Sequence, residues 1–76
     1  METLKNLRNQ KGLTQKQVAK ELNIPMSTYA CYEQGIRTID IRYIIPLSNI
    51  FDCSADEIIS AQINSINIRP SDKIVS

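Results

Sequence analysis

The sequence predicts an all-α fold, a single domain of five short helices in which a tight turn joins the second helix to the third. Apolar residues recur at helical spacing in successive segments, and residues typical of helix starts and helix ends separate these segments. A chain of 76 residues forms one domain and buries only about 60% of its unfolded surface. We therefore expect modest stability and little room for a catalytic cleft.

The first two helices are predicted within residues 1–22. Leu4 and Leu7 lie three residues apart, and Gly12 after a lysine is typical of a helix end. The segment TQKQ from Thr14 fits a capping box, in which the threonine oxygen accepts a backbone N–H and the last glutamine reaches back. A second helix is therefore expected over residues 15–22. Its apolar residues share one face: Val18, Ala19 and Leu22.

A break of only a few residues follows the second helix. Pro25 disfavours helical geometry before it but is compatible with the first turn of a new helix. The third helix is expected near residues 26–34, with Gly35 closing it. So short a join makes the two helices cross steeply, as in a helix-turn-helix. Tyr29 and Tyr32 share one side, where core packing requires water or backbone partners for their hydroxyls.

The fourth helix is expected to begin at Asp40, a good capping residue, and to form the buried centre of the core. Its apolar residues make this the most hydrophobic stretch of the chain: Ile41, Ile44, Ile45, Leu47, Ile50 and Phe51. Pro46 lies inside this stretch, so the helix should bend or split into two turns.

The fifth helix is predicted to be short. SADE from Ser54 is a second capping box, after which Ile58 and Ile59 are expected to face inward. Beyond residue 60 neither helical nor alternating spacing is sustained. We therefore assign residues 1–60 to the domain and residues 61–76 to a C-terminal tail, with a dimerisation segment or a partner-contacting strand as the roles considered.

Composition excludes several classes of protein. No apolar run approaches the roughly 20 residues that span a bilayer, and no signal-peptide pattern begins the chain, so we expect a cytoplasmic protein without a membrane partner. Histidine is absent, and Cys31 and Cys53 lack CxxC spacing. Without paired carboxylates or a glycine-rich phosphate loop, we expect no enzyme activity, no cofactor, no metal and no small-molecule substrate.

Charge is unevenly distributed along the chain. The formal net charge is only +1, which is weak for a nucleic-acid binder. Residues 1–38 nevertheless hold six bases and three acids, whereas residues 39–76 hold three bases and five acids. If the chain binds DNA, the amino-terminal half is therefore expected to face it.

Taken in order, these signals resemble the Cro and C1 repressor family of helix-turn-helix proteins over residues 3–60. The segments that carry the resemblance are LKNLRNQKGLTQKQVAKELNI, STYACYEQGIR and SADEII, with Thr14-Gln15 and the YEQG at residues 32–35 the most specific marks. The resemblance implies a five-helix repressor-like bundle whose second and third helices form the helix-turn-helix. It also implies a structural ion pair between Arg8 and Glu33, for which two solvated charges are the alternative.

Contacts to the DNA backbone are expected at helix starts and flanking charges. The free N–H groups and positive dipole end of the second helix suit phosphates, which points to Thr14 and Gln15. Further backbone contacts are predicted at six positions, where solvated side chains are the alternative: Lys16, Thr28, Gln34, Arg37, Thr38 and Arg42.

Contacts to bases are expected from a stripe of the third helix formed by Met26, Ser27, Ala30 and Cys31. The resemblance implies polar or basic residues at three of these positions, but here they are Met, Ala and Cys. Such a surface cannot form the bidentate hydrogen bonds that arginine makes to guanine. We predict contacts to thymine methyls, with Ser27 as the main donor, and an A·T-containing half-site; packing against protein is the alternative.

The function expected from these features is sequence-specific binding of double-stranded DNA by a small transcriptional regulator, a repressor that occupies an operator. One recognition helix covers only a few base pairs, so a homodimer joined through the fifth helix and tail is expected. The alternative is a protein-interaction module, such as an antitoxin or a coactivator-like adaptor. The low net charge and the apolar stripe favour that alternative.

Overall fold

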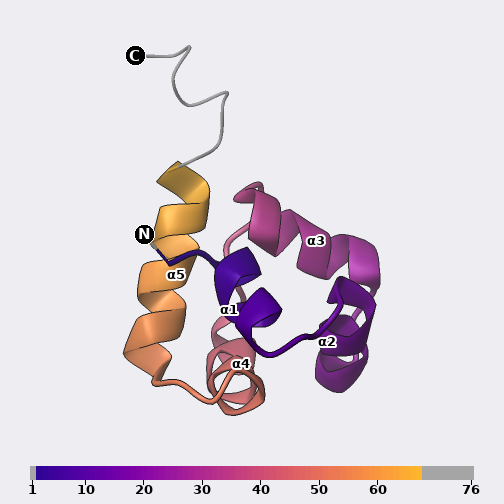
Figure 1. Cartoon of the computed structure of the whole chain (residues 1–76). Helices are drawn as coiled ribbons and strands as arrows, with labels where there is room; N and C mark the ends of the chain where they lie inside the picture. Colours follow the sequence, from indigo (N-terminus) through magenta and orange to yellow (C-terminus); the bar gives the residue numbers. More distant parts are fainter. Residues whose placement is uncertain (1, 68–76) are drawn as a thin grey trace.

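The structure is a computed structural model that describes residues 2–67, which form an all-helical bundle (Figure 1). Its elements are α1 (Leu4–Gln10), α2 (Gln15–Leu22), α3 (Met26–Gln34), the 3-10 turn η1 (Ile41–Tyr43), α4 (Ile44–Ile50) and α5 (Ala55–Asn67). The all-α prediction is thereby confirmed, including the bounds of the second and third helices. None of the helices described has the length and apolar character needed to cross a bilayer.

The core draws side chains from all five helices. α1 lies against α3 and α5, while α2 packs on α3 and α4 (Figure 1). Each helix contributes at least one fully buried side chain to the centre: Leu4, Val18, Tyr29, Leu47 and Ile58. Because every helix is anchored by at least one such residue, the orientation of α3 on the bundle is set by packing rather than by its own propensity.

Four helices end in the same way. One or two residues after each of these helices the backbone is left-handed, with φ of 68° at Gly12, 59° at Asn23, 75° at Gly35 and 54° at Asp52. In each case the next residue donates its N–H to a carbonyl five residues earlier, as Ile24 does to Ala19 at 3.0 Å. The two glycines were predicted as helix ends. The αL caps at Asn23 and Asp52 were not, because Asn and Asp occur at many other positions in helical proteins.

The prediction of one buried fourth helix was wrong at its start. Ile41 is 86% exposed and Ile45 is 59% exposed, and the first turn is the separate 3-10 element η1, which Asp40 caps. Pro46 explains the division: it is the third residue of α4, where a missing N–H costs nothing. Extending α4 towards its amino end would press the proline ring against the carbonyl of Arg42.

The predicted end of the fifth helix near residue 60 was also wrong, because α5 continues to Asn67. Ala61 and Ser65 are fully buried, and the Ser65 hydroxyl accepts a hydrogen bond from the Leu4 N–H at 3.2 Å while donating to the Ala61 carbonyl at 2.8 Å. Ile58 faces inward as expected, but Ile59 is 43% exposed. Residues 61–67 are thus part of the bundle, and the rest of the predicted tail, 68–76, lies outside the described residues.

Candidate nucleic-acid interface

α3 has one face in the core and the other in solvent. Tyr29 and Tyr32 are buried, and their rings meet edge to face with centroids 6.3 Å apart at 89°. This packing, predicted from their i, i+3 spacing, holds the helix firmly on the bundle. The opposite face of α3 is consequently presented outward, in an orientation that the core determines.

The outward face contains the residues predicted to read bases. Met26 is 51% exposed, Ser27 is exposed, and Ala30 and Cys31 are half-buried. At the margins of the stripe, Gln34 is exposed and Thr28 is half-buried. The stripe is therefore open to solvent at Met26 and Ser27 and partly open at Ala30 and Cys31, and Ser27 supplies its hydroxyl.

The start of α2 presents backbone donors. The hydroxyl of Thr14 accepts the N–H of Gln17 at 3.1 Å, and the Gln17 amide oxygen accepts the N–H of Thr14 at 2.8 Å, so the predicted capping box is present. The N–H groups of Gln15 and Lys16 have no intrahelical acceptor, because they precede the first helical hydrogen bond. They are available to an anion placed at this end of the helix.

The Gln15 side chain takes part in an interaction that the sequence did not suggest. Its amide nitrogen donates to Glu33 Oε1 at 3.0 Å. Glu33 also accepts from Arg8, with Nε–Oε2 at 2.6 Å and Nη2–Oε1 at 3.2 Å. The two side chains that the resemblance paired are thus in bidentate contact, and Gln15 joins α2 to the same carboxylate.

Burial and hydrogen bonding act in opposite directions on this carboxylate. The Arg8 and Glu33 side chains are 11% and 4% exposed. Burial alone raises the pKa of the Glu33 carboxyl, but the hydrogen bonds from Arg8 and Gln15 outweigh it and hold the pKa below its ordinary value. The same contact with Glu33 raises the pKa of the Arg8 guanidinium. Both groups therefore remain charged at neutral pH.

Of the two kinds of partner expected for the tyrosine hydroxyls, water and backbone, the described residues provide no backbone partner for Tyr29. Its hydroxyl oxygen is buried and makes no hydrogen bond within the described residues. Burial, followed by the nearby negative charge of Glu33, raises the pKa of the Tyr29 phenol. The phenol therefore stays protonated over the whole physiological range, as a donor with no protein acceptor among residues 2–67.

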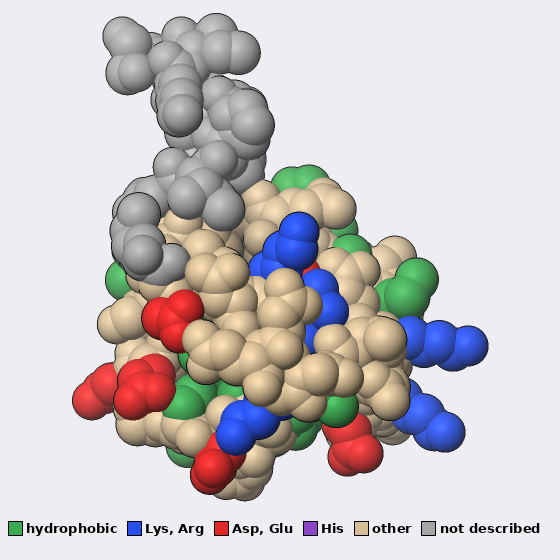
Figure 2. Space-filling model, viewed as in Figure 1, with side chains coloured by type: hydrophobic (Ala, Val, Ile, Leu, Met, Phe, Trp, Pro, Cys, Tyr) green, Lys and Arg blue, Asp and Glu red, His purple; other side chains and the backbone are tan. Residues whose placement is uncertain are grey.

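The side chains predicted to flank the interface differ in whether they already have a partner. Lys16, Arg37 and Thr38 are exposed. Arg42 is already engaged, because its Nη2 lies 3.3 Å from Asp40 Oδ2 and its guanidinium carbon lies 5.4 Å from the centre of the Tyr43 ring. On the face shown in Figure 2, Lys and Arg side chains extend mainly over the side formed by α1 and α2.

Metal-binding chemistry has no evident site in the part of the chain that the structure describes. No three His, Cys, Asp or Glu side chains gather there in a way that suits a metal ion. Cys31 and Cys53 are both free thiols. The outward face of α3 and the start of α2 are the surfaces on which the sequence predicts DNA contacts.

Two helices joined by three residues, with the second projecting a solvent-facing stripe, define a helix-turn-helix protein. The helix-turn-helix family matches residues 4–58. The chain belongs to this family, in its Cro and C1 repressor branch. No solved structure matches it significantly.

Three curated proteins of Bacillus subtilis (strain 168) are similar to the chain. An uncharacterized HTH-type transcriptional regulator, YqaE, is 41% identical over 63 residues, which is 83% of this chain and 54% of that protein. The HTH-type transcriptional regulator ImmR is 38% identical over 53 residues, which is 70% of this chain and 42% of that protein. The HTH-type transcriptional regulator AnsR is 32% identical over 62 residues, which is 82% of this chain and 53% of that protein. The chain spans about half the length of these relatives.

Proposed function

We propose that this chain is a small transcriptional regulator that binds double-stranded DNA sequence-specifically, with α3 in the major groove. The observation that carries the proposal is the division of α3, whose tyrosines are fixed in the core while Met26 and Ser27 are open to solvent. A helix fixed in this way is suited to meet base edges in one orientation. The relatives, all three of which are HTH-type transcriptional regulators, support the same function.

The proposed contacts divide into phosphate and base contacts. Phosphate oxygens are bound by the backbone N–H groups at the start of α2 and by the Thr14 hydroxyl, since the Gln15 side chain is occupied by Glu33. Exposed side chains add to this grip: Lys16, Gln34, Arg37 and Thr38. Thr28 and Arg42 contribute less, because Thr28 is half-buried and Arg42 is paired with Asp40.

The proposed base contacts are predominantly apolar. Met26, Ala30 and Cys31 lie against thymine methyls, and the Ser27 hydroxyl hydrogen-bonds a base edge. Apolar contacts of this kind favour an A·T-containing half-site. They also imply modest affinity for a single half-site, because no side chain of the stripe makes a bidentate hydrogen bond to guanine.

A homodimer completes the proposal, since one helix reads too few base pairs to select an operator. α5 offers a surface for a second copy: Ile59 and Ile63, one turn apart, are 43% and 51% exposed. Two copies joined there would read half-sites about 34 Å apart, one turn of DNA. Occupying such an operator in the cytoplasm would make the protein a repressor.

The proposal is tested by selecting bound DNA from a random pool and then titrating salt against the selected site. A regulator loses affinity steeply as salt rises, because bound Lys and Arg release counterions from phosphates. Lys16→Ala should reduce the slope of log K against log salt by about 1. Lys11→Ala is the matched control, since Lys11 lies beside Asp52, with 3.6 Å between Nζ and Oδ2, away from the proposed interface. Failure to select any sequence would contradict the proposal.

The adaptor function remains the second candidate because of one observation, the exposed Met26 in an apolar stripe. An adaptor would bind all DNA weakly with a shallow salt slope, and its stripe would contact a protein. The salt titration therefore separates the two functions.

Dimerisation is tested by sedimentation of the Ile63→Lys variant. A charge in the proposed interface should convert the dimer to a monomer. Ile41→Lys is the control, because Ile41 is 86% exposed and lies on η1 rather than α5. A wild-type chain that stays monomeric with operator DNA would contradict the proposed homodimer.

A further inference from the structure

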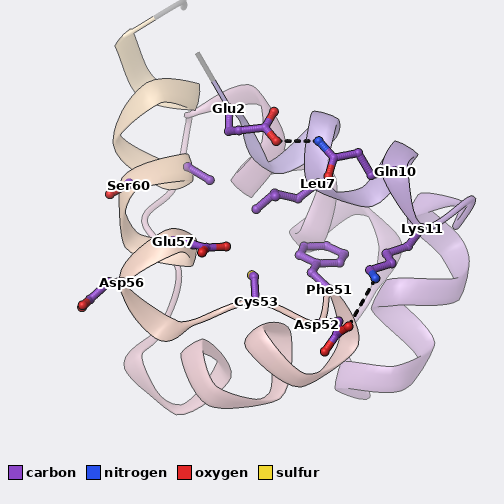
Figure 3. Close-up of a pocket in the computed structure, with 11 residues that line it drawn as sticks. Glu2, Leu7, Gln10, Lys11, Phe51, Asp52, Cys53, Asp56, Glu57 and Ser60 are labelled. Carbon is purple, nitrogen blue, oxygen red and sulfur yellow. Dashed lines mark hydrogen bonds and ion pairs between the residues drawn. The ribbon is translucent and has the colours of Figure 1, made fainter.

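A surface groove of about 420 Å³ lies between α1, the loop from α4 to α5 and the first half of α5 (Figure 3). Among the described residues, those that line it come from these segments and from Glu2 and Lys11 on either side of α1, and none from α2 or α3. The volume is in the range of protein sites that bind ligands or peptide side chains. Its location leaves it free when α3 is occupied.

The floor of the groove is apolar. Leu7 and Phe51 are buried, Cys53 is half-buried, and Figure 3 shows all three side chains directed towards the centre of the groove. Burial raises the pKa of the Cys53 thiol, and the nearby Glu57 carboxylate raises it further. The thiol is therefore neutral at physiological pH and adds to the apolar floor.

The rim of the groove is strongly acidic. Four carboxylates and one lysine line it, a formal net charge of −3: Glu2, Asp52, Asp56 and Glu57 with Lys11. In Figure 3, Glu2 lies at one end and Asp52 at the other, Glu57 points from α5 into the groove, and the Asp56 carboxylate points outward on the other side of α5. Within the described part of the chain Lys11 pairs with Asp52 alone, at 3.6 Å and with the Asp52 side chain 88% exposed, so it neutralises little of this charge.

Glu57 is the carboxylate best placed for a ligand. Its side chain points over the floor towards Cys53 (Figure 3), whereas its backbone N–H is satisfied by the Ser54 hydroxyl at 3.1 Å. Within residues 2–67 neither Glu57 nor Asp56 has an ion-pair partner. A cation placed above the apolar floor would be attracted by the Glu57 carboxylate, while its aliphatic part would pack on the floor.

We propose that this groove binds a basic and apolar peptide segment of a partner protein. A lysine or arginine of the segment pairs with Glu57, and a neighbouring apolar side chain packs on Leu7, Phe51 and Cys53. A peptide fits better than a small organic cation because the carboxylates come from three separate segments and extend from one end of the groove to the other. Such a partner would bind while α3 holds DNA, and the proposal does not depend on DNA binding.

The test titrates the ¹⁵N-labelled full chain, without DNA, with an acetylated hexapeptide of two Lys-Leu-Ser repeats. We expect chemical-shift changes confined to the groove. Glu57→Gln should weaken binding by about tenfold, since it removes the unpaired charge directed over the floor. Glu21→Gln, at an exposed acid on α2, is the matched control and should leave the Kd unchanged. The amide spectrum of each variant also reports whether it is folded.

Two further probes decide whether the floor and the peptide are both required. Cys53→Trp, at a half-buried position whose side chain points towards the centre of the groove (Figure 3), should fill the groove and abolish the shift changes. A hexapeptide of two Lys-Ser-Ser repeats has the same charge and should bind at least about tenfold more weakly, because it lacks the leucines. Equal binding of both peptides, or tighter binding of phenethylammonium than of either, would overturn the proposal.

Discussion

Arg8 on α1 and Glu33 at the end of α3 form a nearly buried, two-pronged ion pair, with 2.6 Å between Nε and Oε2. Arg8 also donates from Nη1 to the Leu13 carbonyl at 2.8 Å, and Gln15 at the start of α2 donates to Glu33. One carboxylate thereby ties three helices together. Because α2 and α3 both hold this group, the network fixes the angle between the two helices of the helix-turn-helix.

Removing the carboxylate should be costly. Glu33→Ala leaves the Arg8 guanidinium buried without its counter-charge, and we expect a loss of about 3 kcal/mol in the free energy of unfolding. Urea denaturation followed by circular dichroism measures it. Glu21→Ala is the control, because Glu21 is exposed and should change stability by less than about 0.5 kcal/mol. Equal losses of unfolding free energy for the two substitutions would show that the Arg8–Glu33 pair does not stabilise the fold.

Acidification should weaken the same network. The pKa of Glu33 is lowered in the folded state by its hydrogen bonds from Arg8 and Gln15, against the effect of burial. A lowered folded-state pKa gives stability that is complete above the unfolded pKa and is lost as pH falls through the folded pKa. The wild-type chain should therefore lose stability below about pH 4. The Glu33→Gln variant should lose less over the same range, and parallel pH profiles would contradict this assignment.

Tyr29 offers the opposite case, a polar group that costs stability. Its buried hydroxyl has no hydrogen-bond partner within the described residues, so Tyr29→Phe should be neutral or should stabilise the fold by about 1 kcal/mol. Tyr29→Ala, which empties the site, should instead cost about 3 kcal/mol or more. Thermal unfolding of both variants measures these two changes in stability. Destabilisation by Tyr29→Phe would mean that the hydroxyl is bonded in solution.

Local signals in the sequence were sufficient for the helix-turn-helix. The capping box at Thr14, the break at Pro25 and the glycine at position 35 are short-range features, and each acts on the backbone within a few residues. The bounds of α2 and α3 followed directly from them. The buried face of α3 followed from the spacing of Tyr29 and Tyr32.

The errors came from tertiary packing. The face of α5 beyond residue 60 is formed by Ala61 and Ser65, which carry too little apolar signal to continue the pattern. Ser65 is buried only because its hydroxyl bonds Leu4 across 61 positions of sequence. In the same way, nothing near Gln15 in the sequence reveals Glu33 as the acceptor of its side-chain amide, whereas its predicted phosphate contact stays a prediction.

The helix end at Gly12 allows a clean test of backbone conformation. Its φ is 68°, and a Cβ added there would meet nothing within 4 Å, so any cost of substitution is conformational. Gly12→Ala should destabilise the fold by about 1 kcal/mol. Gly12→Asn should cost less, because asparagine tolerates the left-handed region, as Asn23 does here. Chemical denaturation of the two variants should rank them in that order, and the reverse order would contradict the conformational argument.

The proposed reading of thymine can be tested on the DNA itself. Met26, Ala30 and Cys31 form most of the outward stripe of α3, and they can contact a thymine methyl but cannot form a bidentate hydrogen bond. Replacing thymine by uracil in the selected half-site removes only the methyl groups, so affinity should fall by about threefold or more for each methyl in contact. Ser27→Ala should weaken binding to both DNAs equally, since its hydroxyl contacts a base edge rather than a methyl. Unchanged affinity for the uracil site would contradict the proposed methyl contacts. It would not contradict DNA binding itself, which the salt titration tests separately.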